Sequence, residues 1–339
     1  MVQPDRVAEY LRSKLPHATG LTVDNVHRIP GGASRETWGL DASWREDGAT
    51  VTRPLVIRRD PPASLLDTDR DVEFRVMAAV RPHGVPVPET LWLEEDPAWL
   101  DRPFFVMERV LGCEASAQKL AYEPRFVAVH AALAQSFTDV LARIHSLDPE
   151  ELDLGFPEPA PAADRCGLAE IEKWEAVLDR EAMDPQPVLR AAFRWMRSNL
   201  PVPAQRIVLV HADYRTGNFL YNEQGEIRAF LDWEMAHLGD PLEDVAWACI
   251  RPWRWAGDER IGGLMPRADF YRMYEDATGL KIDEQAILFW EVLGNVKLAA
   301  IFLTGARSFA EGRTSSMTMA MVGRSVNRLE LEVMDLMGV

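Results

Sequence analysis

The spacing of apolar residues changes along the chain and divides it into two parts. In the first part, short apolar runs bounded by proline or charged residues are typical of strands, whereas Val72, Val76 and Val80 recur at helical spacing. These patterns predict an amphipathic helix within residues 1–15, strands at 54–60, 89–93 and 103–110, and a helix over 69–80.

After Val110 the helical period dominates. Two short apolar runs within this part, at 207–210 and 229–231, predict strands. Gly294 and Gly305 leave open whether the longest predicted helix is continuous, because glycine weakens a helix interior. The predicted helices cover residues 126–147, 168–178, 190–200, 242–250, 268–278, 284–309 and 318–337, and a loop rich in Pro and Ala covers 152–165.

Length and composition agree with a division into two lobes. At 339 residues the chain exceeds the size at which a single hydrophobic core usually stops growing. With 47% hydrophobic and 27% charged residues, its composition is that of an ordinary globular protein. We place the boundary after residue 108.

The segment 209–220 carries the most specific chemistry, because His211, Asp213 and Asn218 stand in the order and spacing of a phosphoryl-transfer loop. A second acid, Asp232, follows on an apolar strand. Nucleotide phosphates repel an incoming nucleophile, so one carboxylate must fix Mg²⁺ over them while another orients the attacking oxygen. A purely structural interpretation, in which these residues form turns and surface positions, does not explain why they occur together.

The His-x-Asp-x-x-x-x-Asn loop and the later Asp resemble the aminoglycoside phosphotransferase and choline kinase-like family. The resemblance implies an α+β, two-lobed protein-kinase-like fold. A small β-rich N-lobe (1–108) covers the nucleotide, and a larger, mostly helical C-lobe (109–339) carries catalysis and binds the acceptor. The resemblance also implies Asp213 as catalytic base, His211 as a brace of the catalytic loop, and Asn218 and Asp232 as ligands of Mg²⁺.

The implied activity is transfer of the γ-phosphoryl group of ATP or GTP to a hydroxyl of a small molecule, such as an aminoglycoside or an amino alcohol. Arg58 stands where many members of the family have a phosphate-binding Lys, and Glu73 is its expected partner. Two solvated arginines at the end of a strand are the structural alternative for Arg58 and Arg59. The other nucleotide-binding candidates are Gly31, Gly32, Ala33 and Ser34, which form a glycine loop, and Met107, Glu108 and Val110 at the lobe connection.

The acceptor is less well defined by the sequence. A formal net charge of −16 argues against a nucleic-acid partner and suits a cationic acceptor, although it is also what solubility alone requires. Arg251 and Arg254 favour an anionic acceptor instead. The aromatic residues expected near the acceptor, or else in the core, are Trp247, Trp253, Trp255 and Trp290.

Further expectations concern the surroundings of the protein. No run of about 18 uncharged apolar residues is present, which predicts no membrane span. Three separated cysteines form neither a disulfide framework nor a zinc spacing, and use of ATP predicts the cytoplasm. We expect Asp244 to brace the catalytic loop and His145 to have only a capping or packing role.

Two functional alternatives remain open. One is a catalytically silent kinase-like protein that binds a nucleotide or a metabolite as a regulator, which the Arg at position 58 favours. The other is a hydrolase that uses His211 and Asp213 in a metal site, for which the sequence lacks the additional ligand cluster.

Overall fold

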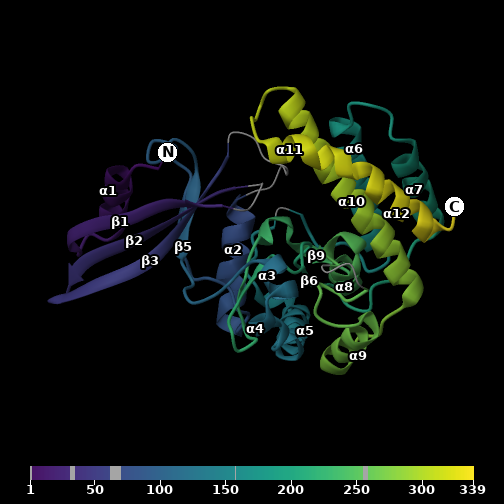
Figure 1. Cartoon of the computed structure of the whole chain (residues 1–339), viewed down its shortest axis with the longest axis horizontal. Helices are drawn as coiled ribbons and strands as arrows, with labels where there is room; N and C mark the ends of the chain where they lie inside the picture. The colour runs from purple at the N-terminus through teal and green to yellow at the C-terminus, as the bar shows by residue number, and fades with distance from the viewer. Residues whose placement is uncertain (1, 31–34, 62–69, 157, 255–258) are drawn as a thin grey trace.

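A five-stranded antiparallel sheet lies at one end of the molecule, and helices make up most of the remainder (Figure 1). The computed structural model describes residues 2–30, 35–61, 70–156, 158–254 and 259–339. The sheet has the order β1-β2-β3-β5-β4. Its strands are β1 Thr19–Ile29, β2 Glu36–Glu46, β3 Ala49–Arg59, β4 Thr90–Glu94 and β5 Phe104–Glu108.

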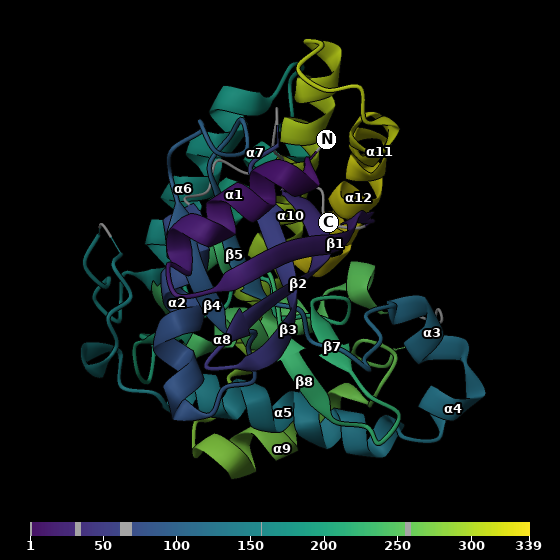
Figure 2. The same ribbon diagram turned by 90° about the vertical axis from the view of Figure 1, so that its left-hand side faces the viewer.

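The two faces of this sheet have different partners because side chains alternate along a strand. Leu55 and Ile57 of β3 belong to the core that also contains Tyr10 of helix α1 (Pro4–Lys14). Figure 2 shows α1 lying across the strands. Val56, between those two residues, belongs instead to the larger core that fills the rest of the protein. The sheet therefore separates a small outer core from the main one.

Helix α2 (Arg70–Val80) joins the sheet to the helical lobe. Its residues Val76, Met77 and Val80 are buried in the main core together with residues of β3 and β5. Glu73 lies on the same helix and is 1% exposed, although it is charged. A buried acid on this helix needs partners from neighbouring elements.

The helical lobe contains two small antiparallel pairs, β6–β9 and β7–β8. Their bounds are β6 Val208–Val210, β7 Phe219–Tyr221, β8 Ile227–Phe230 and β9 His237–Gly239. Around them pack the helices α3 Ala117–Tyr122, α4 Pro124–Val127, α5 His130–Ser146, α6 Cys166–Glu181, α7 Pro187–Ser198, α8 Pro241–Cys249, α9 Arg267–Thr278, α10 Glu284–Ala310, α11 Met317–Val322 and α12 Val326–Met337. A small lobe with an antiparallel sheet and a larger helical lobe confirm the predicted fold class.

Most predicted elements are present, and two predicted helices are interrupted. The helix expected at 126–147 ends at Val127 and resumes at His130. At this break Gly225 of the β7–β8 turn packs against Val129, and a Cβ added to the glycine would lie 3.1 Å from the Val129 oxygen. The helix expected at 318–337 breaks at Gly323, which packs closely against Ala306.

Helix α10 is continuous, which settles the question raised by its glycines. Gly294 lies against the side chains of Ile250 and Trp247, at which an added Cβ would approach to 3.3 Å. By length and composition α10 is apolar enough to cross a membrane, which the sequence expectation missed, but 89% of its most apolar window is buried inside the protein. Such burial is typical of a core helix in a globular lobe.

Candidate active site

The loop between β6 and β7 carries His211, Asp213 and Asn218. The backbone amide of Leu231, just after β8, donates to the backbone carbonyl oxygen of Asn218 at 2.7 Å. Asp232 follows directly, with a left-handed backbone (φ 63°) that is unusual for a residue other than glycine. The structure therefore brings the loop residues and the second acid, separated in the sequence, to one place.

His211 is fully buried, and both of its ring nitrogens are occupied. Nε2 lies 3.0 Å from the Leu231 carbonyl oxygen, which only accepts, so Nε2 carries the proton and donates. Nδ1 then accepts from the Asp213 amide at 3.2 Å. Burial lowers the pKa of His211, which favours this neutral form. His211 braces the loop, as the sequence suggested, and has no nitrogen left for proton transfer.

The Asp213 carboxylate is held by three donors. Trp247 Nε1 and Arg215 Nε each donate to Oδ1 at 2.9 Å, and Asn218 Nδ2 donates to Oδ2. A carboxylate offers about four lone-pair positions. One position, on Oδ2, remains for the proton of an incoming hydroxyl. This is the geometry that a positioned general base requires.

Asp244, on α8, holds the loop from below. Its Oδ2 accepts from the His211 amide at 2.7 Å, and its Oδ1 accepts from the Ala212 amide at 2.8 Å. Ala212 has a left-handed backbone (φ 66°), a conformation that costs free energy unless its surroundings fix it. The expected bracing role of Asp244 is confirmed.

Two further residues fix this loop, and the sequence did not single out their roles. Lys297, on α10, is 2% exposed and donates to the Ala212 carbonyl oxygen at 2.7 Å. Its ammonium group lies 4.5 Å from the centre of the Trp247 ring, on which it forms a cation–π contact. The only signal for Lys297 was a cation inside an otherwise apolar helix.

The expectation for His145 was wrong. His145 is fully buried on α5, and its ring nitrogens lie 3.2 Å from Asp244 Oδ2 and 2.7 Å from the Tyr274 hydroxyl. It thus belongs to the network that holds Asp244, and not merely to the packing of its helix. These partners lie 99 and 129 residues away along the chain, beyond the reach of a local pattern.

A cluster of ion pairs lies on the side of the small lobe. Arg58 Nη2 is 3.1 Å from Glu73 Oε1 and 2.7 Å from Asp232 Oδ1, so the expected Arg58–Glu73 contact is present. Arg35 contacts Glu73 Oε2 at 3.1 Å and lies 3.7 Å from Glu234 Oε2. We call these five residues the ion cluster. Arg59 is also buried and forms an ion pair with Glu36. Neither arginine at the end of β3 is therefore a solvated surface residue.

The three acids of the ion cluster differ in the direction of their pKa shifts. Burial, with help from Glu73 and Asp232, raises the pKa of Glu234 to about 7. Burial likewise raises the pKa of Glu73, because it outweighs the attraction of the arginines. For Asp232, burial acts to raise the pKa, but the charge and hydrogen bond of Arg58, with the charges of Arg215 and His211, together outweigh it and lower the pKa. Asp232 is therefore the cluster's firmly ionised acid.

The donor set fits Mg²⁺ at Asn218 and Asp232. The Asn218 side-chain nitrogen donates to Asp213, which leaves its oxygen free of hydrogen bonds among the described residues. Arg58 takes one oxygen of Asp232 and leaves the other. Oxygen ligands of this kind suit a hard cation that keeps several of its waters. Buried Arg58 Nε also lacks a hydrogen-bond partner within the described chain.

Part of the backbone that the sequence predicted to bind the adenine base is already hydrogen-bonded within the small lobe. The Glu108 amide donates to the Glu89 oxygen at 2.8 Å and the Arg109 amide to the Pro54 oxygen at 3.0 Å, so neither is free for an adenine edge. The Val110 amide forms no hydrogen bond with the described residues, and Met107 is buried in the main core. The glycine loop Gly31, Gly32, Ala33 and Ser34 lies outside the described residues.

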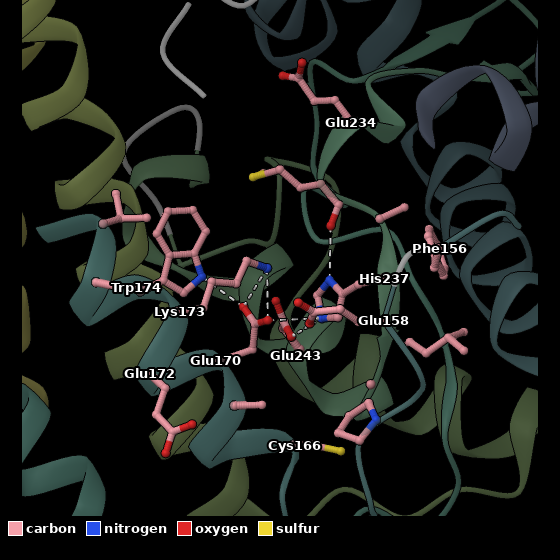
Figure 3. Close-up of a pocket in the computed structure, with 18 of the residues that line it drawn as sticks. Phe156, Glu158, Cys166, Glu170, Glu172, Lys173, Trp174, Glu234, His237 and Glu243 are labelled. Atoms are coloured by element: carbon pink, nitrogen blue, oxygen red, sulfur yellow. Dashed lines mark hydrogen bonds and ion pairs between the residues drawn. The ribbon is translucent and has the colours of Figure 1, made fainter. Parts of the chain in front are cut away.

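A cavity of about 1110 Å³ opens beside this site. Its lining includes Glu234 at one end and, on α6 and near β9, Glu170, Lys173 and His237 (Figure 3). Asp213, Asn218 and Asp232 are not among the described residues that line it. Glu234 thus connects the cavity to the ion cluster. A volume of this size holds a drug-sized molecule.

Within the cavity wall, Glu170, His237 and Glu243 approach one another closely enough to hold a metal ion. Lys173 Nζ, however, lies 3.0 Å from Glu170, and Lys297 Nζ lies 3.3 Å from Glu243. These ammonium groups already neutralise the carboxylates, and the two acids raise the pKa of His237 despite its burial. The cluster excludes His211 and Asp213, so it does not favour the hydrolase interpretation.

The aromatic residues expected near an acceptor have separate places. Trp247 contacts Asp213, and Trp253 stacks on Arg215 at 4.4 Å. Trp290 is buried with its indole nitrogen 3.4 Å from Asp240 and borders the cavity. Arg251 and Arg254 pair with the acids Glu332 and Glu259, and Trp255 lies outside the described residues.

Comparison with known proteins places these features in context. The sequence pattern of the group described as the phosphotransferase enzyme family matches residues 25–286, more than half of the chain. Acyl-CoA dehydrogenase family member 10 of Mus musculus is 29% identical over 341 residues, which cover 95% of this chain but 30% of that protein. The chain therefore spans less than a third of the length of this curated relative.

Two solved structures share the fold. A Ralstonia eutropha protein, provisionally assigned as an aminoglycoside phosphotransferase, has a TM-score of 0.74 at 22% identity and covers 100% of this chain and 99% of its own. A thermostable mutant of aminoglycoside phosphotransferase APH(4)-Ia, in complex with ADP and hygromycin B, has a TM-score of 0.60 at 18% identity and covers 96% of this chain and 98% of its own.

Proposed function

Because the chain belongs to the phosphotransferase enzyme family, we propose that it transfers the γ-phosphoryl group of ATP or GTP to a hydroxyl group of a small molecule. The observation that carries this proposal is the Asp213 carboxylate, fixed by three donors with one lone-pair position left on Oδ2. No other acid among the described residues is held in this way beside two free oxygens suited to Mg²⁺.

In the proposed reaction, Asp213 orients the acceptor hydroxyl and takes its proton. A bond forms between the acceptor oxygen and the γ-phosphorus. The bond from that phosphorus to the bridging oxygen breaks, and its electron pair leaves with the nucleoside diphosphate. Asn218 and Asp232 would hold Mg²⁺, which would neutralise charge on the phosphate oxygens. Arg58, supported by Glu73, binds phosphate from the small-lobe side.

The cavity beside the ion cluster is the proposed site for the part of the acceptor that lies away from the reacting hydroxyl, because Asp213 does not line it. Acids outnumber cations among the described residues of its lining, seven to three, even though two of the acids pair with lysines. This excess supports an acceptor with an amino group, such as an aminoglycoside or an amino alcohol. The name of the mouse relative refers to acyl-CoA, which supports a hydroxylated acyl compound as the second acceptor class to test. Lys173 and Arg180 in the lining are cations that suit the acidic group of such a compound.

The test is ADP release from Mg²⁺ and ATP with a panel of aminoglycosides, amino alcohols, sugars, hydroxy acids and hydroxyacyl thioesters. The wild type is compared with Asp213→Asn and with Asp276→Asn, a control at an exposed acid. Acceptor-dependent release that Asp213→Asn alone abolishes supports the proposal and names the acceptor class. ATP binding without release for any acceptor supports the silent regulator instead.

A further inference from the structure

Arg215 is the cation nearest to the proposed base, and the reaction described above gives it no role. Its Nε donates to Asp213 Oδ1 at 2.9 Å, and its side chain is 23% exposed. The guanidinium thus lies directly beside the proposed base.

The loop leaves space for this guanidinium. Gly217 has a positive φ of 107°, and a Cβ at this position would lie 2.9 Å from Arg215 Nη1. The guanidinium also stacks on Trp253, with 4.4 Å between the guanidinium carbon and the ring centre. This stacking contact does not depend on the hydrogen bond to Asp213, so it can hold the side chain near the site when that bond breaks.

Asp213 does not depend on Arg215 alone. Trp247 donates to the same oxygen, and Asn218 donates to the other. If Arg215 turns away from Asp213, these two donors still orient the carboxylate, and the base gains a free lone pair. Arg215 can therefore exchange its partner without loss of the catalytic geometry.

The transferred phosphoryl group requires cations at both ends of its path, because negative charge spreads over its oxygens in the transition state. Arg58 is tied to Glu73 and Asp232 on the small-lobe side. Arg215 is a second cation, and it contacts the base that would receive the acceptor proton. A guanidinium binds phosphate oxygens with two parallel hydrogen bonds, and phosphate carries more charge than the single carboxylate it would replace.

We propose that Arg215 is a further catalytic residue, which leaves Asp213 when the nucleotide binds and contacts the γ-phosphoryl group directly. This inference rests on the proposed phosphotransferase function. It adds a group that touches the transferred atoms, while the bonds formed and broken and the transfer of the proton to Asp213 stay as described.

The experiment compares the binding of two nucleotides by the full chain, so no acceptor needs to be known. Affinities for ADP and for a non-hydrolysable ATP analogue, each with Mg²⁺, are measured by calorimetry. The variants are Arg215→Ala and Arg215→Lys. Arg267→Ala is the matched control, because Arg267 also pairs with an acid, Glu291, and lies over a ring, that of Tyr271, but outside the site.

We expect Arg215→Ala to weaken binding of the ATP analogue at least tenfold and that of ADP less than twofold. Arg215→Lys restores part of the loss, since an ammonium group acts as a point charge without the two-bonded geometry. Arg267→Ala leaves the ratio of the two affinities unchanged.

Two outcomes overturn the inference in different ways. If Arg215→Ala changes both nucleotides equally, or neither, Arg215 only positions Asp213, and the phosphotransferase proposal still stands. If the wild-type protein binds neither nucleotide, the proposed function itself fails, and this inference fails with it.

Discussion

The catalytic loop and the ion cluster meet at Asp232, yet they hold their polar groups by different means. In the loop, backbone amides and carbonyls are matched to single fixed partners, such as Asp244 and Lys297, on helices of the large lobe. In the ion cluster, two arginines share three acids, and Arg58 bridges two of them. The loop is thus held by hydrogen bonds to single partners, whereas the ion cluster is held by shared ion pairs.

This difference follows from what each region must do. A general base works only if its position is set before the substrate arrives, since reorganisation during the reaction costs free energy. A phosphate site receives several negative charges at once and must exchange its internal ion pairs for new ones. We therefore expect changes in the catalytic loop to affect chemistry and folding, and changes in the ion cluster to affect nucleotide binding.

The largest expected effect is on the reaction rate. Asp213→Asn removes the base while its side-chain shape is kept, and kcat should fall by about 10²–10⁴-fold, the usual contribution of general-base catalysis. Nucleotide affinity, measured by calorimetry, should stay within about twofold of the wild type. Turnover close to that of the wild type would remove Asp213 from the mechanism.

The second prediction compares one buried acid from each region. Interaction with His145 and the amides overcomes burial and lowers the pKa of Asp244, so its charge stabilises the fold. Asp244→Asn puts an amide nitrogen against a donor and should cost about 3 kcal/mol of unfolding free energy. Burial raises the pKa of Glu73, so Glu73→Gln should cost less than about 1 kcal/mol.

Urea denaturation of both variants checks these values. For ATP affinity the order is reversed, and Glu73→Gln should have the larger effect. Glu73→Gln should weaken ATP binding, because Arg58 loses a charged partner that orients it. Equal losses of stability in the two variants would show that the two regions do not differ in the way described.

A third prediction concerns Trp247. Trp247→Phe keeps the ring beneath Lys297 but removes the donor to Asp213. Since a hydrogen bond to a charged group contributes about 1.5–3 kcal/mol, kcat should fall by about 10- to 150-fold, with KM for ATP unchanged. Trp44→Phe is the control, because its indole also donates to an acid, Glu46, but lies in the outer core of the small lobe. A similar fall in kcat in the control would point to packing as the cause.

The smallest effect is a change in pH dependence. Because the pKa of Glu234 is raised to about 7, the folded protein binds more protons than the unfolded chain between about pH 4.5 and 7. This contribution to stability is fully present below the unfolded pKa and is lost as the pH rises toward 7. Glu234→Gln should flatten the fall of thermal stability across this window. An unchanged slope would mean that Glu234 is ionised throughout.

Local sequence patterns located the reacting groups because a phosphoryl-transfer loop requires a fixed spacing. Asp213, Asn218 and Asp232 lie within one loop and one hairpin, so a short segment of sequence contains them. The roles of two groups that hold the loop from other elements escaped the same analysis. Lys297 and Trp247 lie 85 and 34 residues from their partners in the loop, and no local period relates such positions.

The sequence by itself determined most of the helices, part of the strands, the division into a strand-rich and a helical part, and the polar residues of the loop, because all of these depend on neighbours along the chain. The strands β1, β7 and β9 were not predicted. Tertiary structure decided which buried charges pair and where helices break. The helix expected at 318–337 is interrupted at Gly323, where the chain packs closely against Ala306 of α10, and His145 contacts Asp244 because the fold brings α5 near α8. A buried charge takes whichever partner the folded chain brings within reach, since leaving it unpaired costs several kcal/mol.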